Sequence, residues 1–231
     1  MKNYKSRICA VLSAAVLLFS LSVRSGAEDY GLVYSHRKNE KMLISLTFDD
    51  GPHPRYTPEI LDILKKYDIR ATFFVVGQNA SYYPELVKRC QDEGHEIANH
   101  TYSHKNLSKD SFEDICREVR DTENVIYENL DTRTKLLRPP GGLYGKSVIK
   151  AAAELDYTLV LWTVDTRDWA HTPPEKIAKK VTTSIKSGDI ILMHDFIGKN
   201  SPTPEALKKI IPALLKKGYK FVTVSELLGC N

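Results

Sequence analysis

Short apolar runs alternate along the chain with longer amphipathic stretches, and this alternation limits the possible folds more than any other feature of the sequence. The apolar runs are rich in β-branched and aromatic residues, which predicts strands. The expected strands are residues 42–48, 70–77, 95–100, 135–140, 158–165, 189–195 and 220–225, and the expected helices are residues 57–67, 83–94, 108–130, 144–156, 174–188 and 203–218. Strands that alternate with helices run parallel, so they form either an open doubly wound sheet or a closed barrel. No GxGxxG follows the first strand, which removes one reason to expect a dinucleotide fold.

Threonine–proline pairs and glycines mark the expected ends of several helices. Thr57 and Thr203 each precede a proline, which predicts an N-cap residue followed by the first helical turn. Gly94, Gly188 and Gly218 follow helical stretches and predict their ends. Because the 231 residues contain no internal repeat, we expect one domain.

The first 27 residues have the pattern of a secretory signal peptide. Basic residues precede an apolar run over residues 8–23, and small residues follow it at positions 25–27. The run has 16 residues, fewer than the roughly 20 that a membrane-spanning helix needs. We therefore expect a signal peptide at residues 1–27, an irregular lead-in at residues 28–40 and a secreted or cell-wall-associated protein. The alternative is a membrane anchor formed by an uncleaved leader.

The net charge of +4 belongs entirely to this leader. Residues 1–27 hold four basic and no acidic residues, which leaves 29 basic and 29 acidic residues in the remainder. A domain without a basic excess gives no reason to expect nucleic acid as a partner. We expect the protein to be a monomer.

Three cysteines follow the leader and cannot complete a disulfide framework. Cys90 and Cys116 lie at core-facing positions of expected helices, whereas Cys230 lies next to the last residue. A bridge between Cys90 and Cys116 stays open at this point.

Ionisable side chains gather at the carboxyl ends of five expected strands. In chain order they are Asp49, Asp50, His100, His104, Arg138, Asp165, Asp168 and His194. In a parallel barrel these strand ends converge on one face, where active sites form. At the last strand position the chain leaves the pleat, so Asp49 and Asp50 could both reach this face without entering the core, and Gly51 and Pro52 favour a turn there. On its own, this tetrapeptide is more typical of a solvated turn.

His100 and His104 are four residues apart, which would place them on one face of a helical turn. Two imidazoles, one carboxylate and open positions for water form a catalytic zinc site or another open divalent site. Either Asp49 or Asp50 would supply the carboxylate, and the other would be free to act as a base. The spacing alone allows both assignments.

Five motifs in order, TFDDG, HTYSH, RPPGG, DTRDW and LMH, resemble those of the polysaccharide deacetylase family, carbohydrate esterase family four, also known as the nodulation-protein-B homology domain. The resemblance covers about residues 41–227, so residues 41–231 are expected to form the catalytic domain. It implies an α/β fold, a distorted (β/α) barrel of about seven parallel strands with outer helices. It also implies one divalent metal ion, usually Zn²⁺ with Co²⁺ or Mn²⁺ as alternatives, and removal of N-acetyl groups from glucosamine-type sugars.

The resemblance implies a role for each motif position. It implies Asp49 as the general base, Asp50, His100 and His104 as the metal ligands, Arg138 as the residue that orients the base, Asp168 as the acid that orients the late histidine, and His194 as the general acid.

Four further residues are expected to contact the substrate. The resemblance implies that Leu192 forms the wall of an acetyl-methyl pocket. Gly141 stands where the family often has an aromatic residue, so one sugar platform is missing, although its N–H could still bind an oxyanion. Tyr144 or Trp169 would replace the missing aromatic ring.

The expected function is metal-dependent removal of N-acetyl groups from N-acetylglucosamine or N-acetylmuramic acid in an extracellular polysaccharide, either peptidoglycan or chitin-like oligomers. An acetylated glycan is the expected partner. The alternatives are an amidase for a small-molecule amide, an esterase for O-acetylated xylan and a non-catalytic glycan-binding protein. A glycosidase with paired carboxylates needs no metal and leaves His100 and His104 unexplained.

Overall fold

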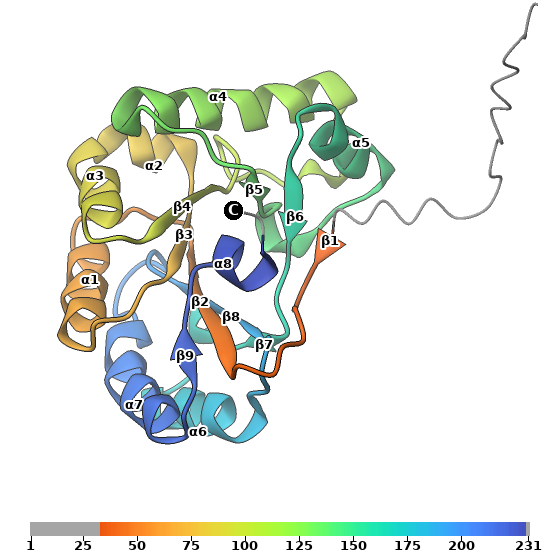
Figure 1. Ribbon diagram of the computed structural model, residues 1–231. Coiled ribbons are helices and arrows are strands. Elements are labelled where there is room, and N and C mark those ends of the chain that lie inside the picture. Colours follow the sequence, from red (N-terminus) through yellow and green to blue (C-terminus); the bar gives the residue numbers. More distant parts are fainter. Residues whose placement is uncertain (1–32, 230–231) are drawn as a thin grey trace, which may run out of the picture.

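A parallel sheet curved into a distorted barrel forms the centre of the molecule (Figure 1). The structure is a computed structural model that describes residues 33–229, so the predicted signal peptide lies outside the described residues. The strands are β1 Val33–Tyr34, β2 Leu43–Asp49, β3 Thr72–Val75, β4 Glu96–Asn99, β5 Leu136–Leu137, β6 Thr158–Val160, β7 Val164–Asp165, β8 Ile190–His194 and β9 Lys220–Phe221. They follow the order β1-β6-β5-β4-β3-β2-β8-β7, with β9 paired to β2, and these pairings are all parallel. The expected fold class is confirmed.

Helices cover the outside of this barrel and close one of its ends. They are α1 Tyr56–Lys66, α2 Gly77–Tyr82, α3 Pro84–Asp92, α4 Phe112–Leu130, α5 Lys146–Glu154, α6 Pro174–Ser184, α7 Thr203–Lys216 and α8 Val224–Leu228. In Figure 1, α4 runs along one side of the barrel, and α6 and α7 lie together on the opposite side. The short helix α8 packs Val224 and Leu227 against Leu136 and Ile190, at the end where the strands begin. Among the described residues, no helix is long and apolar enough to cross a membrane.

The barrel is closed by residues 158–165, which the sequence predicts as a single strand. The structure divides this segment into β6, which pairs with β5, and β7, which pairs with β8. Between them the chain bends, and the N–H of Leu161 donates to the carbonyl of Tyr34 at 2.7 Å. β6 and β7 therefore lie near opposite ends of the strand order, and residues 161–163 connect them.

Other differences from the sequence prediction concern single strands and short helices. The last predicted strand, residues 220–225, is a strand only at Lys220–Phe221. Thr223 then caps α8 in a reciprocal hydrogen-bonded capping box with Glu226. The predicted irregular lead-in contains β1, and the unpredicted helix α2 follows β3 directly.

Thr57 and Thr203 are not N-caps, which corrects the sequence prediction. The N-cap residues are Arg55 and Pro202, which precede the predicted ones by two residues and one residue. Both threonine hydroxyls instead donate to buried carboxylates, Thr57 to Asp195 at 2.5 Å and Thr203 to Asp168 at 2.7 Å. Each helix start is thereby tied to a strand-end acid.

Two apolar clusters hold the helices on the outer face of the sheet. The larger contains residues of α1, α3, α6 and α7, and the smaller joins α4 and α5 to β5 and β6. Cys90 is buried in the larger cluster and Cys116 in the smaller. Both are free thiols, so the bridge that the sequence left open is not formed.

Candidate active site

Six of the eight ionisable residues predicted at the strand ends line one cavity, and the other two, Arg138 and Asp168, lie behind it as partners of Asp49 and His194. The cavity has a volume of about 300 Å³. It is lined by Asp49, Asp50, His100, His104, Gly141, Trp162, Asp165, Trp169, Leu192 and His194. These residues come from the ends of β2, β4, β7 and β8 and from the loops that follow β5, β6 and β7.

The alternation of side chains along β2 determines where Asp49 lies. Leu46 and Phe48 belong to the cluster outside the sheet. Thr47 and Asp49 have the opposite side-chain direction, and both accept hydrogen bonds from the buried Arg138. Asp49 is only 3% exposed, so it reaches the cavity from inside the barrel. The expectation that it would stay out of the interior is therefore wrong.

Arg138 holds Asp49 through a buried ion pair. Its Nη1 lies 2.6 Å from Asp49 Oδ1 and 2.8 Å from Thr47 Oγ1, and its Nε donates to the carbonyl of Val160 at 3.0 Å. Burial lowers the pKa of Arg138, and the charge of Asp49 opposes this shift. Loss of one partner from such a buried pair costs about 3–5 kcal/mol, because the other charge stays buried alone. The ion pair places Arg138 against the carboxylate that the family resemblance implies as the base, and its orienting role stays a prediction.

Asp50 reaches the cavity because the backbone turns immediately after β2. Its φ is 76°, in the left-handed region, so its side chain does not follow the alternating directions of the side chains in the strand. Its carbonyl accepts a hydrogen bond from Asn79 of α2 at 2.7 Å. A Cβ on the next residue, Gly51, would lie 2.0 Å from the Asp195 carboxylate, so only glycine fits this turn.

Asp50, His100 and His104 have the geometry of a metal-binding triad. One potential ligand atom from each lies within 4.8 Å of the other two. His100 Nδ1 lies 2.7 Å from the carbonyl of Arg138, which can only accept, so Nδ1 carries the proton and Nε2 presents a lone pair. That Nε2 lies 3.3 Å from Asp50 Oδ1, a buried oxygen without a hydrogen-bond partner. The Nε2 atom of His104 lies 2.9 Å from the same oxygen. A carboxylate oxygen that faces two imidazole nitrogens fits a cation held among the three, so these residues fit a divalent metal ion.

The pKa of Asp50 agrees with a role as a metal ligand. Burial raises the pKa of its carboxyl group, but the two adjacent imidazoles lower it by more, so the net pKa lies well below the ordinary value. Asp50 is therefore ionised at neutral pH and available as a ligand.

The two histidines are not on a helical turn, which corrects the sequence prediction. Residues 100–104 form an irregular loop in which Thr101 and His104 have φ angles of 67° and 55°. The imidazole centroids nevertheless lie 5.0 Å apart. Glu118 of α4 stabilises the loop by accepting hydrogen bonds from the backbone N–H groups of residues 102 and 103 at 3.0 and 2.8 Å. Nothing in the motif spacing pointed to Glu118.

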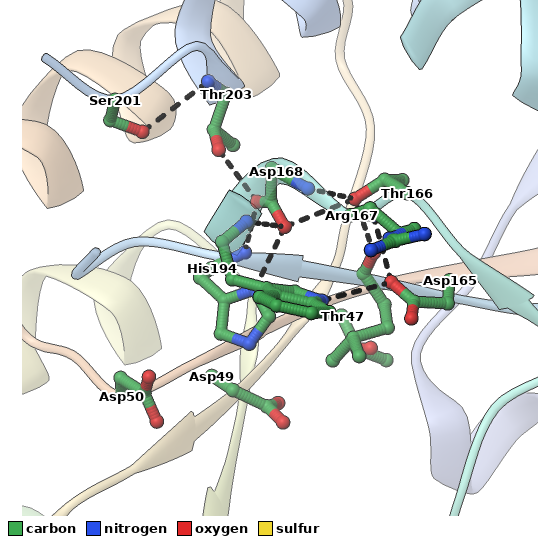
Figure 2. Close-up of polar contacts among 12 residues, drawn as sticks. Thr47, Asp49, Asp50, Asp165, Thr166, Arg167, Asp168, His194, Ser201 and Thr203 are labelled. Carbon is green, nitrogen blue, oxygen red and sulfur yellow. Dashed lines mark hydrogen bonds and ion pairs between the residues drawn. The ribbon is translucent and has the colours of Figure 1, made fainter. Parts of the chain in front are cut away.

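His194 is held by Asp168, as Figure 2 shows. Asp168 is completely buried, and its Oδ1 lies 2.8 Å from His194 Nδ1. Its Oδ2 accepts from the backbone N–H of His194 at 2.7 Å and from the Thr203 hydroxyl at 2.7 Å. Burial lowers the pKa of His194, but the hydrogen bond and charge of Asp168 outweigh it, together with the charges of Asp49 and Asp50, and raise that pKa to about 9. His194 is therefore a protonated imidazolium at neutral pH, with Nε2 free to donate.

The predicted substrate-contact residues divide into two groups. Gly141, Leu192 and Trp169 line the cavity, whereas Tyr144 is exposed and not part of its lining. Trp162, which lies within the predicted strand 158–165, forms part of the cavity wall. The bend between β6 and β7 brings its side chain there, and a strand prediction could not anticipate that bend.

The chain matches a known protein family in its sequence. The polysaccharide deacetylase family model matches residues 36–160. A peptidoglycan-N-acetylglucosamine deacetylase of Bacillus cereus is 44% identical over 208 residues, which cover 89% of this chain and 97% of the relative.

Solved structures give the same result for the fold. The crystal structure of a peptidoglycan N-acetylglucosamine deacetylase matches with a TM-score of 0.82 and 38% identity, over 85% of this chain and 92% of that one. A family 4 acetyl xylan esterase from Clostridium thermocellum, solved with a cobalt ion, matches with a TM-score of 0.77 and 37% identity, over 81% and 91% of the two chains. The chain belongs to the polysaccharide deacetylase family of hydrolases.

Proposed function

We propose that the protein is a metal-dependent hydrolase that removes N-acetyl groups from N-acetylglucosamine residues of peptidoglycan and releases acetate. The observation that carries this proposal is the arrangement of Asp49 and His194 in one cavity with the triad of Asp50, His100 and His104. A carboxylate held by Arg138 and an imidazolium held by Asp168 supply the base and the acid that amide hydrolysis requires. The substrate is inferred from the relatives that act on peptidoglycan.

Asp50, His100 and His104 would hold the metal ion, which we propose to be Zn²⁺. A divalent ion there lowers the pKa of water and polarises the acetyl carbonyl. Asp49 takes the proton from the attacking water, with its carboxylate oriented by Arg138. His194 then donates a proton from Nε2 to the departing sugar nitrogen. Water is consumed, the C–N bond of the amide breaks, and acetate and a free amine are formed.

The apolar part of the cavity suits the acetyl group. Leu192 is 3% exposed and lines the cavity next to His194, so an acetyl methyl group fits against it. We infer that Gly141 lets the sugar approach closely, because no side chain occupies that position. The signal-peptide pattern of residues 1–27 supports a polymer outside the cell as the substrate.

Acetate release distinguishes this function from its rivals. We expect purified protein to release acetate from peptidoglycan, to lose this activity after chelation and to regain it when Zn²⁺ or Co²⁺ is added back. Chitin oligomers and acetylated xylan serve as parallel substrates, and a preference for xylan would identify an esterase instead. New reducing ends that survive chelation would indicate a glycosidase. Absence of acetate from all three substrates, with metal bound, would refute the proposal.

A further inference from the structure

A second cavity lies beside the candidate active site, on the loops that directly follow β2 and β8. It has a volume of about 420 Å³ and is lined by His53, Arg55, Tyr56, Phe196, Gly198, Lys199 and Asn200. His53 follows the ligand Asp50 by three residues, and Phe196 follows His194 by two. Because β2 and β8 are paired at Asp49 and His194, both loops leave the barrel at the same point of its rim.

Three rings are stacked in this cavity. The His53 imidazole lies between Tyr56 and Phe196, with both centroid distances at 5.0 Å and both interplanar angles at 26°. Tyr56 is buried and accepts a hydrogen bond from the N–H of Ser201 at 3.2 Å, which fixes one end of the stack. Phe196 at the other end is 39% exposed. An exposed aromatic ring on a fixed support can contact the C–H face of a sugar ring.

The charge of this cavity is positive. Arg55 and Lys199 are both exposed lining residues, and the lining contains no acidic residue. Within residues 33–229, neither side chain forms an ion pair with an acid. The nearby acids in the first turns of α1 and α7, Glu59 and Glu205, lie 3.8 and 2.6 Å from Lys208 instead.

We propose that this cavity binds the carboxylate-bearing part of a glycan strand next to the acetylated sugar that is being hydrolysed. The proposal rests on the proposed function and adds a substrate class to it, anionic glycans in preference to neutral ones. The aromatic stack provides a surface for the sugar, and Arg55 and Lys199 provide the charge and the N–H donors for the carboxylate. In peptidoglycan that carboxylate is either the free lactyl group of the neighbouring sugar or a group on its attached peptide.

The test compares three substrates of equal length. One is a neutral N-acetylglucosamine oligomer, one is a glycan with free lactyl carboxylates, and one is a glycan with attached peptides. For the double variant Arg55→Gln/Lys199→Gln we expect kcat/KM to fall about fivefold on one or both carboxylate-bearing glycans and to stay unchanged on the neutral oligomer. The affected substrate identifies the source of the carboxylate. Increased salt should reduce the wild-type preference in the same way.

Two further variants make the result specific. Lys66→Gln/Lys216→Gln removes the same charge from the last turns of α1 and α7, the helices that begin beside the cavity, and should change no substrate preference. Phe196→Ala should lower kcat/KM on all three substrates, because the ring contacts the sugar and not its charge. An unchanged substrate preference in Arg55→Gln/Lys199→Gln would overturn this inference and leave the proposed function intact. Failure of the wild-type protein to release acetate from any of the three would overturn the proposed function itself.

Discussion

Replacement of Asp168 by Asn tests the proposed acid most directly, because it removes one charge and changes little volume. The pKa of His194 is raised to about 9, from 6.5 for an ordinary histidine, and the contacts with Asp168 are the largest cause that raises it. A difference of about 2.5 pKa units corresponds to about 3 kcal/mol. In Asp168→Asn we therefore expect the pKa of His194 to return to 6.5 or below. At pH 8 the protonated fraction would fall about 30-fold, and kcat/KM would fall with it.

The assay is the pH profile of acetate release by wild type and variant, both loaded with the same metal. We expect the alkaline limb of kcat/KM to move to lower pH by about 2.5 units in Asp168→Asn. Asp189→Asn is the matched control, because Asp189 is a buried carboxylate just before the other end of β8, where it accepts from Thr163 and from the N–H of Lys186. The Asp189→Asn variant should lose stability, but the alkaline limb of its kcat/KM profile should stay at the wild-type position. An alkaline limb within half a unit of wild type in Asp168→Asn would refute the assignment of His194 as the acid.

The interaction of Asp168 with His194 should also affect the stability of the chelated protein. The folded pKa of His194, about 9, lies above the unfolded value near 6.5. Its stabilising contribution is therefore complete below pH 6.5 and is lost as the pH rises through 9. Asp168→Asn should abolish this alkaline loss, which urea unfolding at a series of pH values would measure.

Three further predictions follow from neighbouring residues. Asp49→Asn should lower kcat at least about 100-fold, because the base is lost, while calorimetry still detects Zn²⁺ binding; near-native acetate release would show that Asp49 is not the base. Burial and the charges of Asp50 and Asp49 raise the pKa of Asp195 to about 7, above its unfolded value near 4. The free energy of unfolding of the chelated protein should therefore fall as pH rises from about 4 to 7, and Asp195→Asn should remove this fall; an unchanged pH dependence would contradict it. Gly51→Ala places a methyl group 2.0 Å from the Asp195 carboxylate, so it should reduce both thermal stability and acetate release, and a wild-type melting temperature would show that the turn can relax.

Much of the site could be predicted because its chemistry lies in short contiguous motifs at strand ends. Asp49, Asp50, His100, His104 and His194 line one cavity, as strand-end convergence requires. The choice between the two aspartates as the ligand could not come from spacing. It depends on the left-handed backbone of Asp50, which the sequence reveals only through a family resemblance.

The features that the sequence did not reveal depend on contacts between distant segments. Thr57 and Thr203 satisfy the local rule for helix caps, yet their hydroxyls bind acids 138 and 35 residues away. Trp162 reads as part of a buried strand, but the chain bends there because each half of its segment pairs with a different neighbour. Local propensity cannot predict either outcome, since tertiary pairing overrides it.

The bend between β6 and β7 also links the residue that holds the base to the strand that ends in the acid. On one side, Arg138, which holds the base, donates to the carbonyls of Val160 and Leu161. On the other side, β7 pairs with the strand that ends in the acid, His194. The pairing of Asp49 with His194 sets the separation of base and acid directly, whereas residues 160 and 161 support the arginine that holds the base. An insertion between residues 161 and 163 would therefore disturb Arg138 before it altered the paired strands that carry Asp49 and His194.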